Sequence, residues 1–516
     1  MTVASIPATP PEWLAHPRGS IDVGDVLAAL RYYPDNYFDA VLTDPPYGLS
    51  EPPDAEEMAA ILAAWLTGQP YTPKGKGFMG KEWDAFVPGP EVWREVLRVM
   101  KPGAMLMAFA GSRTHDLMGL AIRLAGFEIR DGLMWLYGSG YPKSMALDKA
   151  IDKLDAVEAR RERDLRFTAW LRSTGITSRQ INEVTNSAMA AHYLSDKKQP
   201  AVPTADMMDL MRPLLPEVPD WVEAIVAERT IESENMKARE VLARVVGKDT
   251  TKARAGMPGQ GNERREYDVT APATPEASTW AGHGTALKPG HEPITLAMKP
   301  LDGTFAQNAL RWGVAGLNIE GGRAGFASAA TDETGRWPSN VHMDEATAAE
   351  LDEQSGTLRT GAKKPGGIRD MGYTGSKGQI DKGQSASEGG ASRFFYVAKP
   401  TRAERDAGLQ EEPDRLRHRV NAGGLEHDPR WAPVVVKNDH PTVKPIGLTR
   451  QLATLLLPPA RPGGEPRRIL VPFAGSGSEM IGAALAGWED VTGIEREPEY
   501  ARTAAARLRH HTQEAP

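Results

Sequence analysis

The chain has 516 residues, of which 41% are hydrophobic and 25% charged, and its formal net charge is −7. This length exceeds what one hydrophobic core supports, so two or three cooperating units are expected. No stretch reaches the length of a membrane span and no apolar signal core follows Met1, so we predict a cytoplasmic protein with no membrane partner.

Cysteine is absent from the chain. Its absence excludes disulfides, thiolate metal sites, redox CxxC motifs and any cysteine nucleophile. The 11 histidines form no HExxH or similar cluster, so no metal site is predicted.

The N-terminal part alternates between short apolar strands and amphipathic helices. Strands are expected at 38–43, 104–110 and 127–137, with helices over 90–100 and 114–125. Glycine or proline follows each helix and marks its end. Such alternation predicts an α/β sheet covered by helices on both faces.

From 144 to 246 the sequence is charged and helical. A helical pattern over 165–172, a glycine turn and a second helix from Thr177 or Ser178 outline a helix-turn-helix. A plain helical insertion explains the pattern at least as well. The polar side chains that the motif would offer to DNA are Arg179, Gln180 and Asn182.

Residues 247–390 are rich in Gly, Pro, Ser and Thr, and we expect an irregular region that is a candidate for target recognition. Residues 359–402 hold nine Lys and Arg against three Asp and Glu. DNA binding needs only such a local basic surface, although a solvated loop explains the charge equally well. On the first interpretation, the DNA contacts include Lys363, Lys364 and Arg369.

The C-terminal part, 391–516, contains a β-α-β unit. A strand from Arg468 runs into a glycine turn, a helix covers 478–486, and a second strand closes on Glu495. Glycines allow close backbone approach to a nucleotide-like cofactor, and Glu495 is placed to accept both ribose hydroxyls. Met480 replaces the third glycine of a dinucleotide motif, which disfavours NAD and favours S-adenosylmethionine, a nucleoside without phosphate. A plain tight turn between strand and helix is the alternative.

The N-terminal motif is Thr43-Asp44-Pro45-Pro46-Tyr47-Gly48, directly after an apolar strand. The lone pair of an exocyclic base amine is delocalised into the ring, so an enzyme that methylates this nitrogen must accept its N–H hydrogens. Asp44 supplies one acceptor and the carbonyl of Pro45 a second, while the prolines stiffen the loop. Tyr47 offers a flat face on which an extruded base can stack.

Three segments together resemble the DNA amino-methyltransferases, which act on adenine N6 or cytosine N4. They are Asp44–Tyr47, Asn438–Pro445 and the Phe-x-Gly-x-Gly turn from Phe473. With the catalytic loop first and the cofactor turn last, the chain resembles the permuted β class over about residues 20–140 and 390–510. The family implies a seven-stranded Rossmann-like sheet, with cofactor and base meeting at the carboxyl ends of the strands.

The resemblance also implies roles for individual residues. The target base would be held by Asp44, Pro45, Pro46 and Tyr47. The cofactor would be held by Phe473, Gly475, Ser476, Gly477 and Glu495, with Thr442 and Lys444 beside it and Asp25 near its adenine. Many relatives have Asp-Pro-Phe where this chain has Val471-Pro472-Phe473, so the carboxylate at the methionine end of the cofactor is absent from that position.

These observations predict a site-specific DNA methyltransferase that acts on adenine N6, of a kind found in restriction-modification systems. Residues 1–143 would form its catalytic half and 391–516 its cofactor half; a homodimer is left open. The alternatives are an N4-cytosine enzyme, which usually has Ser at the position of Asp44, methylation of RNA or of a protein glutamine, and a catalytically weak DNA-binding relative. Cytosine-C5 methylation is excluded because it requires a cysteine.

Overall fold

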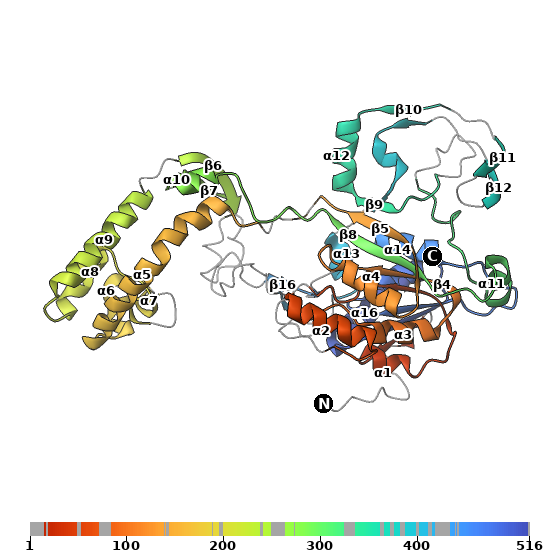
Figure 1. Cartoon of the computed structure of the whole chain (residues 1–516), viewed down its shortest axis with the longest axis horizontal. Coiled ribbons are helices and arrows are strands. Elements are labelled where there is room, and N and C mark those ends of the chain that lie inside the picture. The colour runs from red at the N-terminus through yellow and green to blue at the C-terminus, as the bar shows by residue number, and fades with distance from the viewer. Residues whose placement is uncertain are drawn as a thin grey trace. The chain divides into compact units, whose positions relative to one another are not determined.

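In the computed structural model the described residues are 15–16, 19–48, 53–71, 84–138, 140, 144–187, 189–195, 200–237, 241–248, 264–272, 274–324, 336–361, 366–371, 376–381, 387–398, 402–410, 415–417, 434–438, 440 and 443–513. The chain divides into two compact units (Figure 1). Unit 1 lies within residues 1–140, 290–421 and 432–516, and unit 2 within residues 141–289 and 422–431.

Unit 1 is built on one large, mostly parallel sheet. Its strand order is β1-β2-β18-β17-β3-β4-β8-β5-β9-β14, and only β1 and β8 run antiparallel to their neighbours. The bounds are β1 Ala15–His16, β2 Gly19–Val23, β3 Phe38–Thr43, β4 Met100–Phe109, β5 Glu128–Leu136, β8 His291–Met298, β9 Val341–Asp344, β14 Tyr396–Ala398, β17 Arg468–Pro472 and β18 Asp490–Glu495. The α/β prediction is confirmed, although the sheet has ten strands in place of the expected seven.

Helices cover both faces of this sheet, because successive side chains of a strand point to opposite faces. In β3, Ala40 and Leu42 join one hydrophobic core, whereas Val41 joins the other. The first core includes α14 Ile446–Leu456, α15 Ser478–Ala486 and α16 Pro498–Gln513. The second includes α1 Val26–Leu30, α2 Ala55–Leu66, α3 Pro90–Val99 and α4 His115–Leu124 (Figure 1). Both faces of the sheet are therefore buried.

Strand β4 begins earlier than the sequence suggests. The helix was expected to end at residue 100 and the strand to begin at 104, yet Lys101-Pro102-Gly103 lie within β4. Gly103 has φ +75°, and the pairing with β3 shifts register between Phe38 and Ala40. An irregularity of this kind accommodates a proline and a left-handed glycine inside a strand.

Part of the region expected to be irregular belongs to unit 1 as regular structure. It contributes β8 and β9 to the large sheet, together with α11 Phe305–Trp312 and α12 Glu345–Ser355. The remaining short elements of unit 1 are β10 Leu358–Thr360, β11 Gly366–Met371, β12 Ser376–Asp381, β13 Ser387–Gly389, α13 Arg402–Asp406, β15 Arg415–Arg417 and β16 Val434–Val436.

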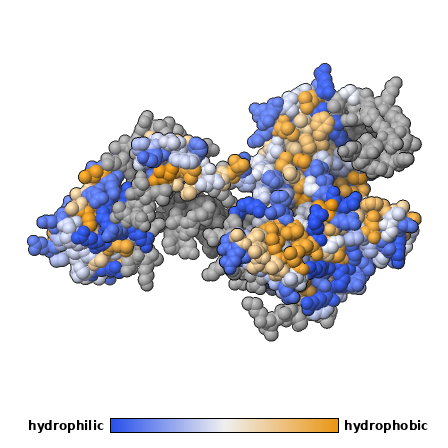
Figure 2. Space-filling view, viewed as in Figure 1, coloured by the Kyte–Doolittle hydropathy of each residue, from blue (hydrophilic) through white to orange (hydrophobic). Residues whose placement is uncertain are grey.

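Unit 2 is a helical body inserted between β5 and β8. Its elements are α5 Leu147–Ser173, α6 Ser178–Thr185, α7 Ala190–Leu194, α8 Ala205–Met211, α9 Asp220–Lys237, β6 Val241–Lys248, β7 Arg264–Thr270 and α10 Pro275–Thr279. Phe167, Ile181 and Val222 belong to a hydrophobic core of its own. Its outer surface mixes hydrophilic and hydrophobic residues on the face drawn in Figure 2.

Candidate active site

The order of the strands brings four candidate site residues together at the carboxyl ends of neighbouring strands. These residues lie at the carboxyl ends of four strands that are consecutive neighbours in the sheet: Asp25 after β2, Glu495 as the last residue of β18, Phe473 after β17 and Asp44 after β3. In open parallel sheets, ligands bind in the crevice outside these ends. A cavity of about 310 Å³ lies here.

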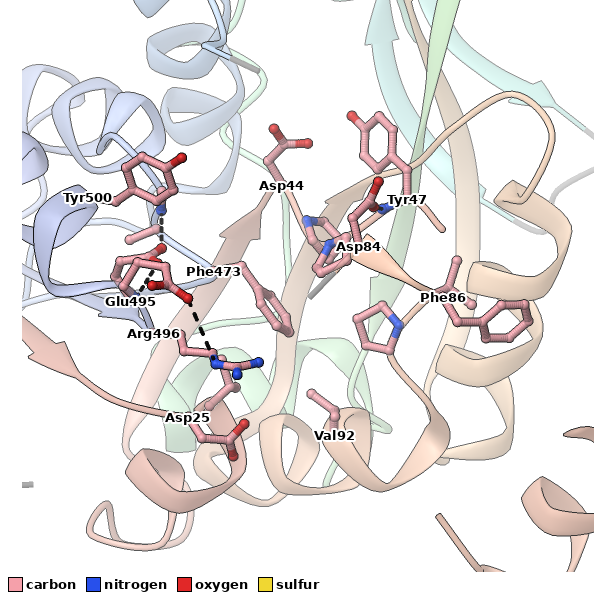
Figure 3. Close-up of a pocket in the computed structure, with 18 of the residues that line it drawn as sticks. Asp25, Asp44, Tyr47, Asp84, Phe86, Val92, Phe473, Glu495, Arg496 and Tyr500 are labelled. Atoms are coloured by element: carbon pink, nitrogen blue, oxygen red, sulfur yellow. Dashed lines mark hydrogen bonds and ion pairs between the residues drawn. The ribbon is translucent and has the colours of Figure 1, made fainter. Parts of the chain in front are cut away.

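The cavity has two distinguishable ends. In Figure 3, Asp44 and Tyr47 stand side by side at one end and Asp25 lies at the other, with Glu495 and Phe473 between them. The wall also includes aromatic and aliphatic side chains from residues 65–92, such as Trp65, which the sequence did not single out. The site thus offers carboxylates at several points of a largely apolar pocket.

Asp44 is a buried carboxylate in which one oxygen has a hydrogen-bond partner and the other has none. Its Oδ2 lies 2.8 Å from Lys444 Nζ. Its Oδ1 is buried and has no hydrogen-bond partner. Burial raises the pKa of Asp44, against the opposing effect of Lys444. A buried acceptor without a partner is costly, so Asp44 is suited to accept a hydrogen bond from a ligand.

Lys444 lies just before α14 and contacts the catalytic loop. Besides Asp44, its Nζ donates to the Tyr47 hydroxyl at 3.0 Å and lies 3.1 Å from Glu292 Oε2. Burial alone would lower the pKa of Lys444, but Asp44 and Glu292 raise it, so the ammonium keeps its charge. The sequence predicted Lys444 beside the cofactor; in the structure its ammonium contacts Asp44 and Tyr47 of the catalytic loop.

Tyr47 is fixed at both its backbone and its hydroxyl. The hydroxyl donates to Glu292 Oε2 at 3.1 Å, and Thr114 donates to the Tyr47 carbonyl at 2.6 Å. Burial and the charges of Asp44 and Glu292 raise the pKa of Tyr47 well above its usual value, so the hydroxyl stays protonated. The ring therefore has one fixed position in the pocket wall.

Asp84 binds the backbone of the catalytic loop. Its Oδ1 accepts from the backbone N–H groups of Tyr47 and Gly48, at 2.9 and 3.0 Å. Gly48 has φ +63°, and a Cβ at this position would lie 3.0 Å from the backbone of Phe86. Asp84 is a positioning residue that the sequence motifs do not reveal, because it lies 37 residues beyond Tyr47.

The glycine turn after β17 brings backbone close to the cavity. Phe473, a non-glycine residue, has φ +60°, and Gly475 has φ +52°. A Cβ on Gly475 would lie 2.7 Å from the His440 ring, so a larger residue would collide there. Ser476, like Gly475, lines the cavity.

Glu495 is held by two backbone groups. Gly475 N–H donates to its Oε2 at 2.7 Å and Glu497 N–H to its Oε1 at 2.8 Å. Each oxygen keeps a second lone pair, so the carboxylate can still accept two ligand hydroxyls. Asp25 caps α1 by accepting from Ala28 N–H at 3.2 Å and lies at the rim of the same cavity.

Gly477 and Thr442 are the two remaining residues predicted at the cofactor site. Gly477 faces α16: its φ is +81°, and a Cβ there would lie 2.8 Å from the Cβ of Ala504. The absence of a side chain at Gly477 therefore allows the turn to pack against α16. The sequence suggested that it allows contact with the cofactor. Thr442 lies outside the described residues.

The candidate DNA-contacting side chains of unit 2 are partly used inside the unit. Thr177 is the N-cap of α6, and Gln180 completes a capping box with it. Asn182 Oδ1 accepts from Ala190 N–H at 3.2 Å and so anchors α7. Arg179 is exposed on α6. In unit 1, Lys363 and Lys364 lie outside the described residues, and the side chain of Arg369 does so too.

Within the described part of the chain, no group of His, Asp and Glu side chains could hold a metal ion, and no helix is long and apolar enough to cross a membrane.

No family model and no curated protein matches this chain. Among solved structures, PvuII DNA methyltransferase (cytosine-N4-specific) matches with 11% identity and a TM-score of 0.35, covering 95% of this chain and 86% of its own. A protein from Thermus thermophilus described as a putative DNA modification methylase, complexed with S-adenosyl-L-methionine, matches with 13% identity and a TM-score of 0.30, covering 96% and 95%.

A third match is the complex of M1.HpyAVI with SAM, at 10% identity and a TM-score of 0.29, covering 94% and 98%. Similarity at this level carries no functional argument, so the conclusions below depend on this chain's own residues.

Proposed function

We propose that this chain is a β-class DNA amino-methyltransferase that transfers a methyl group from S-adenosylmethionine to N6 of an adenine turned out of the DNA helix. The observation that carries the proposal is the unpartnered, buried Oδ1 of Asp44, at the carboxyl end of β3. It shares one cavity with Glu495, whose carboxylate two strands away suits a ribose.

In this mechanism Asp44 Oδ1 accepts one N–H of the base amine and the carbonyl of Pro45 accepts the other. Lys444 holds the second oxygen of Asp44, so the carboxylate cannot turn away. Bound S-adenosylmethionine would supply the electrophilic methyl group. The amine nitrogen would form the new N–C bond as the bond between sulfur and the methyl group breaks, with S-adenosylhomocysteine as the leaving group. The nitrogen loses one proton, which passes to the solvent by way of Asp44 Oδ1, and fixed acceptors favour this step by positioning.

Tyr47 supplies the stacking surface for the base. Its hydroxyl is anchored by Glu292 and Lys444, so little side-chain freedom is lost when a base binds. Adenine is favoured over cytosine because the loop begins with Asp, where N4-cytosine enzymes usually have Ser.

DNA recognition is assigned to two candidate segments. One is unit 2, with Arg179 exposed on α6, and the other is the basic segment 359–402, which includes Lys363, Lys364 and Arg369. No described residue of either segment lines the cavity.

The test compares Asp44→Ala with the wild type and with Asp116→Ala, which removes an exposed carboxylate of α4 outside the cavity. We expect Asp44→Ala to abolish transfer of tritiated methyl groups to mixed-sequence DNA while S-adenosylmethionine still binds in calorimetry. Asp116→Ala should retain both. Near-normal transfer by Asp44→Ala would contradict the assignment.

A further inference from the structure

Glu479 is a buried acid that the mechanism above does not use. It is the second residue of α15, in the otherwise uncharged stretch Ser478–Ala486. Only 4% of the residue is exposed, and it lines the same cavity as Asp44 and Ser476. Its Oε1 has no hydrogen-bond partner. The ionised form of a carboxylate in this setting would be stabilised by a hydrogen-bond donor from a ligand.

The charged side chains around Glu479 do not provide a hydrogen-bond donor for its Oε1. Asp44 repels it, while Lys444 and Arg507 attract it. Lys444 Nζ is already engaged with Asp44, Tyr47 and Glu292. Arg507 donates to Ser476 and Ser478 and to the carbonyl of Glu404. Neither cation donates a hydrogen bond to Glu479 Oε1, although the buried Nε of Arg507 is itself without a partner.

Burial and the neighbouring Asp44 raise the pKa of Glu479 to about 7. Without a ligand, a large fraction of Glu479 is therefore protonated at neutral pH. A cation with N–H groups would hold the charged form, because it supplies both an opposite charge and a donor.

We infer that Glu479 binds the α-ammonium group of the methionine moiety of S-adenosylmethionine. This assignment depends on the proposed function. Glu479 lines the same cavity as Asp44 and interacts with it electrostatically, whereas Glu495, which accepts from Gly475 N–H, suits the ribose. The sulfonium carries positive charge but no hydrogen to donate, so it cannot satisfy Oε1.

The same assignment explains how the chain functions with valine at position 471. Val471 is fully buried in the core on the α14–α16 side of the sheet and does not line the cavity. No carboxylate therefore enters the cavity from the end of β17. Glu479 supplies one from the first turn of the following helix.

The experiment uses two ligands and the full-length protein. S-adenosylhomocysteine has the ammonium group but no sulfonium, and its deamino analogue has neither. We expect Glu479→Gln to weaken calorimetric binding of S-adenosylhomocysteine by about 10- to 100-fold, as for loss of a charged hydrogen bond. Binding of the deamino analogue should be unchanged. Glu489→Gln, which alters a half-exposed acid outside the cavity, should bind both ligands as the wild type does.

A second measurement uses the unaltered protein. Wild-type affinity for S-adenosylhomocysteine should fall as the pH drops through about 7, because Glu479 becomes protonated. The deamino analogue should show no such fall, and Glu479→Gln should remove it. Since His440 also lines the cavity, a pH dependence that survives Glu479→Gln would assign the titration to another group and overturn the inference.

The remaining outcomes separate this inference from the proposed function. Equal affinity of wild type and Glu479→Gln for S-adenosylhomocysteine would overturn the role of Glu479 and leave the methyltransferase proposal intact. Equal losses for both ligands, or a loss with S-adenosylmethionine alone, would also overturn it. Failure of the wild type to bind S-adenosylmethionine would overturn the proposed function itself.

Discussion

At the scale of single residues, the candidate site depends on side chains that hold the Asp44–Tyr47 loop in place. Lys444 and Asp84 do so from different directions, one through side chains and the other through backbone N–H groups. Their removal should therefore have different consequences.

Lys444→Met should raise the pKa of Asp44, because the ammonium is the charge that lowers it. The base amine needs the ionised carboxylate, so methyl transfer should decline, and the acid limb of its pH profile should move to higher pH. Removing the partner of buried Asp44 and of partly buried Glu292 should also lower the free energy of unfolding by about 3 to 5 kcal/mol. Transfer rates from about pH 5 to pH 9 test this, and an unshifted acid limb would refute it.

Asp84→Ala should lower the rate of transfer without changing the affinity for S-adenosylmethionine, since Asp84 contacts the backbone of the catalytic loop and has no hydrogen bond to the glycine turn among those the structure shows. Asp84→Asn keeps an oxygen that can accept from Tyr47 and Gly48, so it should retain more activity than Asp84→Ala. Steady-state kinetics with both variants measure the difference. Equal activity of the two variants would exclude a role through these hydrogen bonds.

At the scale of elements, the turn between β17 and α15 must fit against α16. Gly477 has φ +81°. A Cβ added to it would lie 2.8 Å from the Cβ of Ala504 in α16. Gly477→Ala should lower the free energy of unfolding by about 2 to 4 kcal/mol, from the left-handed backbone and the collision together.

Ala504→Gly should recover part of this loss, because it removes the atom that the new Cβ meets. The double-mutant cycle by urea unfolding should give a favourable coupling of about 1 kcal/mol. Strictly additive effects of the two substitutions would show that the collision with α16 is not the cause.

Local patterns predict those elements whose partners lie nearby in the sequence. The apolar run at 38–43 and the β-α-β unit from Arg468 to Glu495 occur where expected, because strand, glycine turn and helix are encoded within about 30 residues. Strand β8 was not assigned, since a short apolar run bounded by irregular sequence does not distinguish a strand from a loop.

Site residues, too, were predicted only where the sequence pattern is local. Asp44, Tyr47, Gly475 and Glu495 were predicted because they belong to contiguous motifs. Glu292, which pairs with Tyr47 245 residues earlier, carries no local signal and is brought in by the antiparallel β8. Glu479 was not predicted, although a lone acid in an apolar helix is a signal that could have identified it.

At the scale of the whole molecule, unit 2 interrupts a hairpin of unit 1. Strands β5 and β8 pair antiparallel from Glu128 to Leu136, and the Tyr137 N–H donates to the Gly290 carbonyl at 3.0 Å. Joining Gly140 directly to Gly290 would leave Gly138-Ser139-Gly140 as a three-residue hairpin loop, a common length.

Deletion of 141–289 should therefore leave a folded unit 1, because unit 2 has its own core. We expect unchanged affinity for S-adenosylmethionine and a loss of preference among DNA sites, measured by calorimetry and by sequencing of the methylated product. Retention of the same methylated motif at the same rate would exclude unit 2 as the reader and assign recognition to segment 359–402.

The most direct test of the central claim is the identity of the methylated nucleoside. DNA incubated with the purified protein and S-adenosylmethionine is digested to nucleosides and analysed by mass spectrometry, with Asp44→Ala as the blank. The account predicts N6-methyladenine with the wild type alone. N4-methylcytosine would overturn the choice of adenine, and no methylated nucleoside from a protein that binds the cofactor would contradict the assignment to DNA.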